Sequence, residues 1–331
     1  MKLRFALVPL SVILLSVLLE SCRPPYHSED EHYVFVTFST NLPYWKEAQA
    51  GLTDASNQMG IKAEVTGPAT YSPDDELKAF QEAVAEKPSG ILVSASNPEL
   101  FKGPIDAAIQ QGIPVICVDA DSPNSHRVSF IGTDNFRAGQ EIGKSMAQIL
   151  KGKGNVVVIT VPGQFNLDER LRGVTDAWKT YPGIKVIKTI DDKSDPNAAY
   201  DAITDVLRSK DKPDGIVGLE AVGGGGAADA LYRINLTGKI PIVSFDKDPE
   251  TLDWIQRGGI TETVAQKPYV MGYYGLKFLD DLHHNAVHEF KDWRTAPESP
   301  MPAWLDTGTA IVNKANLAAF REALAEHPRP M

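Results

Sequence analysis

The stretch GILVSASNPELFKGPIDAAIQQGIPVICVDADS, residues 90–122, contains the pattern that most clearly indicates a fold class. It opens with a short apolar run, continues through an amphipathic segment from Leu100 to Gln111, and closes on a second apolar run from Ile113 to Val118. Short runs rich in Val and Ile that alternate with longer amphipathic segments are typical of a parallel sheet with connecting helices. Strands without a polar face need helices on both sides of the sheet. The stretch therefore predicts one strand-helix-strand unit of a doubly wound α/β fold.

The same alternation runs along most of the chain and restarts once. A first series begins with YVFVTF (33–38), and a second series contains NVVVITV (155–161), GIVGLE (215–220) and IPIVSFD (240–246). The chain has 331 residues, which is enough for two domains that each bury a core. We therefore expect two doubly wound parallel-sheet lobes in tandem.

Residues 1–21 have the composition of an export signal. Lys2 and Arg4 precede an apolar run from Phe5 to Leu19. This run is shorter than the roughly 20 residues of a membrane-spanning helix, so a cleaved signal peptide is favoured. We therefore expect the protein to act outside the cytoplasm, in the periplasm or at the cell surface.

The residues that follow the signal predict a lipid anchor. Leu-Glu-Ser-Cys at residues 19–22 resembles a bacterial lipobox, in which the thiol of Cys22 accepts a diacylglycerol, although Glu20 departs from that pattern. Plain secretion and an uncleaved anchor stay open as alternatives. Residues 22–32 are polar and led by prolines, which favours a flexible tether between anchor and domain.

Composition and motifs exclude several classes of function. The formal net charge is −10 and the basic residues are scattered, which argues against a nucleic-acid partner. Two cysteines cannot form a disulfide framework, and Cys117 in an apolar run is expected to be buried. The sequence has no nucleophile elbow, Walker motif or metal-ligand motif. We therefore expect no enzyme activity, no catalytic residue, no cofactor and no metal.

Polar residues follow the predicted strands where a ligand site is expected. Ligands of parallel α/β sheets bind at the carboxyl ends of the strands, next to loops and helix N-termini. The segments in this position are residues 39–45, 94–97, 119–122, 164–170, 220–226 and 246–247.

Five parts of the chain carry a family resemblance through their order and spacing. They are STNLPYWKEAQAG (39–51), PVICVDADS (114–122), IGTDNFRAGQEIG (131–143), LDERLRGVTDAW (167–178), and IPIVSFDKDPE (240–250) with TVAQKPYVMG (263–272). Together they resemble the bacterial periplasmic sugar-binding proteins of the ribose and galactose type. The resemblance implies a type I periplasmic binding protein, with two lobes joined by a three-strand hinge. The N-terminal lobe is expected at residues 33–133 and 267–305, and the C-terminal lobe at 134–266 and 306–331.

The resemblance also implies which residues bind the ligand. Aromatic residues stack on a sugar ring, an arginine and amides bind hydroxyl oxygens, and acids accept hydrogen bonds from neighbouring hydroxyls. At those positions this chain has Asn41, Tyr44, Trp45, Ser96, Asp119, Asp121, Arg170, Glu220, Asp246 and Gln266. Two alternatives stay open, since Tyr44 and Trp45 also suit core packing, and Arg170 also suits a surface ion pair.

Departures from the ribose pattern bear on the ligand. Leu42 replaces an amide, Ala120 and Asp121 follow Asp119 where the pattern has an arginine, and Glu220 stands at an amide position. Acids then outnumber cations, which disfavours anionic solutes because like charges repel in a cleft of low dielectric. Neutral sugars, polyols and amino sugars remain. Residues 66–71 also resemble the rhamnose and autoinducer-2 binding branch.

The resemblance implies a partner as well. A monomeric lipoprotein of this family hands its solute to an ATP-driven (ABC) permease. A sensory receptor for a sugar or autoinducer-2 uses the same pocket and stays open as the alternative. A transcription repressor of related fold would begin with a helix-turn-helix, and an enzyme would need a nucleophile or metal in the cleft.

Overall fold

A computed structural model describes residues 26–210 and 212–326. The predicted signal peptide and Cys22 lie outside the described residues. Residues up to Glu31 belong to a separate N-terminal unit, in which the Ser28 N–H donates to the Glu31 Oε1 at 2.7 Å. The chain from His32 onward forms one compact unit. Within the described part of the chain, no helix combines the length and the apolar character needed to cross a membrane.

The first lobe of this unit is built on a parallel sheet of six strands, in the order β11-β5-β4-β3-β1-β2. The strands are β1 (His32–Val36), β2 (Lys62–Thr66), β3 (Gly90–Val93), β4 (Val115–Val118), β5 (Ser129–Gly132) and β11 (Trp304–Asp306). Helices cover both faces, with α2 (Pro43–Met59) and α10 (Pro268–His283) on one and α3 (Pro73–Ala85) and α4 (Pro98–Gln110) on the other. Cys117 lies in β4 and is fully buried, which confirms its predicted place in the core.

The second lobe repeats this plan. Its six strands run in the order β12-β10-β9-β8-β6-β7, and only β12 is antiparallel to its neighbour. They are β6 (Lys153–Thr160), β7 (Gly183–Asp191), β8 (Gly215–Gly218), β9 (Ile242–Phe245), β10 (Glu262–Ala265) and β12 (Ala310–Asn313). On one face lie α5 (Asn135–Ile149) and α6 (Phe165–Trp178), and on the other α7 (Pro196–Arg208), α8 (Gly223–Arg233), α9 (Pro249–Arg257) and α11 (Leu317–Glu326).

Proline and polar caps start many of these helices directly after a strand end. Six of the described helices, α2, α3, α4, α7, α9 and α10, have proline in their first turn, where its missing N–H costs nothing and its fixed φ suits the helix. The side chains of Ser72, Asn97, Asp134 and Asp195 each accept a backbone N–H of the helix they precede. Short loops therefore connect strand ends to helix N-termini at one edge of each sheet.

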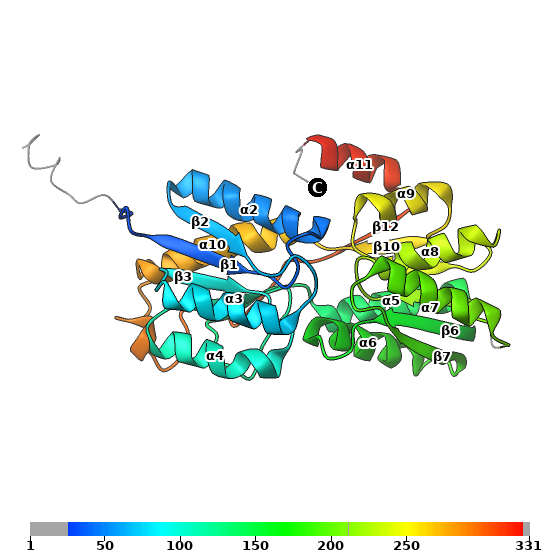
Figure 1. The fold of residues 1–331 in the computed structure, drawn as a ribbon, viewed down its shortest axis with the longest axis horizontal. Helices are drawn as coiled ribbons and strands as arrows, with labels where there is room; N and C mark the ends of the chain where they lie inside the picture. The colour runs from blue at the N-terminus through cyan, green and yellow to red at the C-terminus, as the bar shows by residue number, and fades with distance from the viewer. Residues whose placement is uncertain (1–25, 211, 327–331) are drawn as a thin grey trace, which may run out of the picture. The chain divides into compact units, whose positions relative to one another are not determined.

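The chain passes between the two sheets at three places among the described residues, after β5, after β10 and after β11. Each lobe is therefore built from separate parts of the chain. In Figure 1 the orange α10, which follows β10 of the second lobe, lies with the blue and cyan elements of the first lobe. The predicted fold class, two doubly wound lobes, is confirmed. Strand β1 starts at His32, one residue before the predicted start, because His32 pairs with Lys62 of β2.

Candidate functional site

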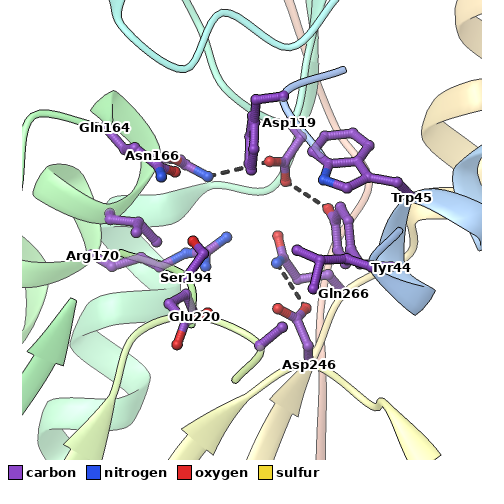
Figure 2. A pocket seen from close by; sticks show the side chains of 14 residues that line it. Tyr44, Trp45, Asp119, Gln164, Asn166, Arg170, Ser194, Glu220, Asp246 and Gln266 are labelled. Atoms are coloured by element: carbon purple, nitrogen blue, oxygen red, sulfur yellow. Dashed lines mark hydrogen bonds between the residues drawn. The ribbon is translucent and has the colours of Figure 1, made fainter. Parts of the chain in front are cut away.

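A cavity of about 40 Å³ lies between the lobes, at the carboxyl ends of the strands. Both sheets contribute to its walls, because strands β4, β6, β8, β9 and β10 all end beside it. Figure 2 shows Asn166 and Arg170 facing Tyr44 and Trp45 across the space. The lining residues are Phe38, Leu42, Tyr44, Trp45, Asp119, Gln164, Asn166, Leu167, Arg170, Ser194, Glu220, Ala221, Asp246 and Gln266.

Arg170 is held rigidly at the cavity wall and is only 1% exposed. Its Nε donates to Asn135 Oδ1 at 2.8 Å, and its Nη1 donates to the main-chain oxygen of Leu219 at 2.7 Å. The guanidinium lies 4.0 Å from the ring centroid of Phe245, a cation-π contact. Its Nη2 is buried and has no hydrogen-bond partner among the described residues. The arginine therefore has one oriented donor left for a ligand, and the alternative of a surface ion pair is wrong.

Two glycines bring the helices under Arg170 together. A Cβ on Gly139 of α5 would lie 2.1 Å from the main-chain oxygen of Arg170, and a Cβ on Gly173 of α6 would lie 2.1 Å from the oxygen of Phe136. Side chains at these two positions would push α5 and α6 apart. The glycine pair thus fixes the position from which the arginine reaches the cavity.

Two aspartates occupy equivalent places in the two lobes. Asp119 follows β4 and Asp246 follows β9, and both have a left-handed backbone, with φ of 65° and 69°. Each donates its N–H to the neighbouring strand, to Ile131 and Val264 respectively. Aspartate tolerates this conformation better than most residues do, and such backbone often occurs at functional sites. The two turns direct both carboxyl groups into the cavity (Figure 2).

Asp119 links the lobes through its carboxyl group. Its Oδ1 accepts the Tyr44 hydroxyl at 2.5 Å, and its Oδ2 accepts Asn166 Nδ2 from the second lobe at 3.2 Å. Burial raises the pKa of Asp119 to about 6, although the Arg170 charge and the Tyr44 hydrogen bond act in the opposite direction. The Oδ1 of Asn166 has no partner among the described residues.

Asp246 and Gln266 form the opposite wall. Gln266 donates from Nε2 to Asp246 Oδ1 at 2.9 Å, and its Oε1 accepts the Thr133 hydroxyl at 2.6 Å. Thr133 and Gln266 lie on two of the segments that cross between the lobes. Burial raises the pKa of Asp246, and Arg170 lowers it.

Glu220 lies at the N-terminus of α8 beside a second buried acid. Its carboxyl group accepts the N–H of Val222 at 2.9 Å and the N–H of Gly223. Burial, followed by the charge of Asp192, raises the pKa of Glu220 well above its usual value. Burial also raises the pKa of Asp192 to about 6. Two carboxyl groups this close favour sharing a proton.

The aromatic wall serves the core and the cavity together. The Trp45 ring lies edge-on to Phe35 and Phe38, with centroid distances of 6.0 and 5.0 Å. It also lines the cavity with Tyr44 and Phe38. Trp45 therefore packs in the core and also lines the cavity, and its contact with a sugar ring stays a prediction.

Seven predicted ligand residues line the cavity, namely Tyr44, Trp45, Asp119, Arg170, Glu220, Asp246 and Gln266. Three others do not. Asn41 is exposed to solvent. The Ser96 hydroxyl donates to the buried carboxyl of Glu76. Asp121 forms a two-armed ion pair with Arg127, whose Nη2 lies 2.7 Å from Asp121 Oδ2.

Sequence reasoning did not single out Gln164, Asn166 and Ser194. Gln164 and Asn166 belong to the segment 164–170, which was expected to face the ligand because it follows a strand. Ser194 lies in the loop after β7 with φ of 54°. No pattern in the sequence distinguishes it from the other polar residues of that loop.

The fold and the cavity define a two-lobed binding protein whose ligand is enclosed by both lobes. Residues 33–285 match the family described as periplasmic binding protein domain, and the chain belongs to that family. Its members are extracytoplasmic substrate-binding proteins rather than enzymes. The family resemblance found in the sequence is thereby confirmed.

Several characterised proteins are similar to this chain along most of its length. A sugar-binding protein of a sugar ABC transporter from Bacillus halodurans is 35% identical, with a TM-score of 0.78 over 88% of this chain and 100% of that chain. The arabinose binding protein from Geobacillus stearothermophilus is 35% identical, with a TM-score of 0.73 over 88% of this chain and 99% of that chain. The D-allose-binding periplasmic protein of Escherichia coli K12 is 25% identical over 75% of this chain and 83% of its own length.

Proposed function

We propose that the protein captures a small, neutral, hydroxyl-rich solute, a sugar or polyol, between its lobes for import by an ABC permease. The observation that carries the proposal is a set of polar atoms in the cavity that have no hydrogen-bond partner among the described residues, namely the donors Arg170 Nη2 and Gln164 Nε2 and the acceptor Asn166 Oδ1. A buried polar atom without a partner is costly, and a hydroxyl group can satisfy a donor and an acceptor. The Trp45 and Tyr44 rings supply an apolar surface for the C–H groups of a sugar.

Charge restricts the class of solute further. Asp119, Glu220 and Asp246 line the cavity against a single guanidinium, that of Arg170. A carboxylate or phosphate on the solute would meet these acids in a site of low dielectric. Neutral sugars and polyols fit this balance, and so does an amino sugar. The similarity to binding proteins of sugar transporters supports the same class.

Loading requires the lobes to separate. Asp119, Arg170 and Asp246 in the walls of the cavity are between 1% and 4% exposed, so a solute in solvent does not reach them while the lobes are together. We infer that the lobes open about the three crossing segments, admit the solute and close on it, as is general for periplasmic binding proteins.

We also propose that Cys22 carries a lipid that anchors the protein, and that the chain acts as a monomer. The lipobox-like residues 19–22 support the anchor. Incorporation of labelled palmitate into the wild type but not into Cys22→Ser is the expected result. Equal labelling of both proteins would contradict it.

A thermal-shift screen tests the proposed function. The screen compares arabinose, galactose, allose, xylitol and glucosamine with glucuronate and ribose 5-phosphate at matched concentration. A ligand at a concentration 100 times its Kd raises the free energy of unfolding of the protein by about 2.7 kcal/mol, so a true ligand gives a clear rise in Tm. We expect the largest rise from a neutral or amino compound. A rise from the anionic compounds alone would contradict the proposal.

A further inference from the structure

A buried ion pair connects the two lobes beside the cavity. Glu47 lies on α2, which packs on the first sheet, and Lys247 follows β9 of the second sheet. The Lys247 Nζ is 2.6 Å from Glu47 Oε2, and the two side chains are 10% and 8% exposed. In the part of the chain that the structure describes, the exposed ion pairs, such as that between Lys179 and Asp176, each join residues of a single lobe.

The same ammonium group supports the cavity wall. Lys247 Nζ donates to the main-chain oxygen of Gln266 at 2.9 Å. The side chain of Gln266 holds Asp246, and both residues line the cavity. Lys247 therefore connects α2 of the first lobe to a crossing segment and to two cavity residues of the second lobe.

Movement of α2 away from the end of β9 would break this ion pair. Separation returns both charged groups to water, whereas contact removes them from water and leaves each dependent on the other. A contact made in only one of two conformations shifts the population toward that conformation. The strength of this pair thus affects how much of the protein has its lobes together before any solute is bound.

We propose that Glu47 and Lys247 are positioning residues that hold the lobes together and so set the affinity for the solute. The effect on solute affinity rests on the proposed function. The effect on the separation of the lobes does not, because it needs no solute. Neither Glu47 nor Lys247 lines the cavity, so the ion pair acts on the lobes and not directly on the solute.

The test uses Glu47→Gln, which keeps the size of the side chain and removes its charge. Small-angle X-ray scattering without sugar is expected to give a larger radius of gyration than for the wild type. The Kd for arabinose, measured by calorimetry, is expected to rise by roughly tenfold or more. The apparent affinity falls in proportion to the fraction of molecules whose lobes are together. Scattering and affinity that both match the wild type would overturn the proposal.

The double variant Glu47→Gln/Lys247→Met separates pairing from simple damage. With Lys247→Met alone it completes a double-mutant cycle, and the double variant is expected to expand by less than the sum of the expansions of the two single variants, because either change removes the same ion pair. Expansions that simply add in the double variant would overturn the role of the pair. Asp253→Asn is the control, since Asp253 forms a 2.6 Å ion pair with Arg321 that is exposed and lies within the second lobe. It is expected to leave both measurements unchanged.

The two proposals fail separately. If the wild type binds no sugar in the screen, the proposed function fails, and the scattering of the sugar-free variants still decides the role of the ion pair. If sugar binds and the variants scatter like the wild type, the ion-pair proposal alone fails.

Discussion

Residues at this site are held by contacts with the protein that leave one polar group free to bind a ligand. Arg170 is the clearest case, since Asn135, Leu219 and Phe245 engage the rest of the guanidinium. Lysine keeps the charge but cannot reproduce the planar fork. The specificity of the site therefore depends on geometry as well as on charge.

Arg170→Lys is predicted to weaken sugar binding by roughly 10- to 100-fold, because a hydrogen bond to a charged group contributes about 1.5–3 kcal/mol. Calorimetric titration measures the Kd, and thermal unfolding checks that the variant is folded. Arg172→Lys, on the exposed side of the same helix, is the matched control. Wild-type affinity in the folded Arg170→Lys variant would remove this arginine from the site.

Asp119 predicts a pH dependence of stability. Its pKa is raised to about 6 in the folded protein, so the folded state binds a proton more tightly than the unfolded state. The stability contributed by this protonation is present below about pH 4 and is lost as the pH rises to about 6. Asp119→Asn removes the ionised form, so its free energy of unfolding at pH 7 is predicted to exceed that of the wild type by up to about 3 kcal/mol.

Urea unfolding at pH 4 and pH 7 measures this difference. The gain is expected to be largest at pH 7 and small at pH 4. A difference between the two proteins that stays constant over this range would contradict the titration of Asp119.

At the scale of elements, close helix packing positions the site. The pair α5 and α6 meets through Gly139 and Gly173, and the pair α2 and α10 meets through Gly51 and Gly272 in the first lobe. A Cβ on Gly51 would lie 2.0 Å from the oxygen of Tyr269. Each lobe thus uses glycines to bring together two helices that carry or support cavity residues.

Gly139→Ala is predicted to destabilise the protein by about 1–3 kcal/mol through overpacking, and to weaken sugar binding because Arg170 shifts. Chemical unfolding and calorimetry measure the two effects. Gly103→Ala in α4 is the control, because a Cβ there meets no atom within 4 Å and alanine favours a helix. Equal stability of Gly139→Ala and the wild type would show that α5 and α6 separate without cost.

The sequence predicts elements better than it predicts individual contacts. The alternation of apolar runs and amphipathic segments predicted β1, β3, β4, β6, β8 and β9 and the loops at their ends, but not β2 and β7, whose residues are largely exposed or half-buried and form no apolar run. It was not sufficient for Asp121, because its partner Arg127 is brought close by the folding of the loop between β4 and β5. Ser96 was misplaced for a similar reason, since Glu76 reaches it from α3.

At the scale of the molecule, the two sheets have the same strand order, and the chain crosses between them after β5, β10 and β11. Such connections keep each lobe rigid and concentrate bending in a few residues. The hydrogen bond from Asn166 to Asp119 and the ion pair of Glu47 with Lys247 join the lobes on either side of the cavity. We therefore expect binding and lobe movement to be one coupled equilibrium.

A crystal structure of the protein grown with the best neutral sugar from the screen tests whether the two lobes enclose a sugar. We predict sugar density between the lobes, with hydroxyl groups bonded to Arg170 Nη2 and Asn166 Oδ1 and one face of the ring against Tyr44 or Trp45. Sugar density outside the cavity, or a bound sugar that leaves both atoms unpaired, would contradict the account.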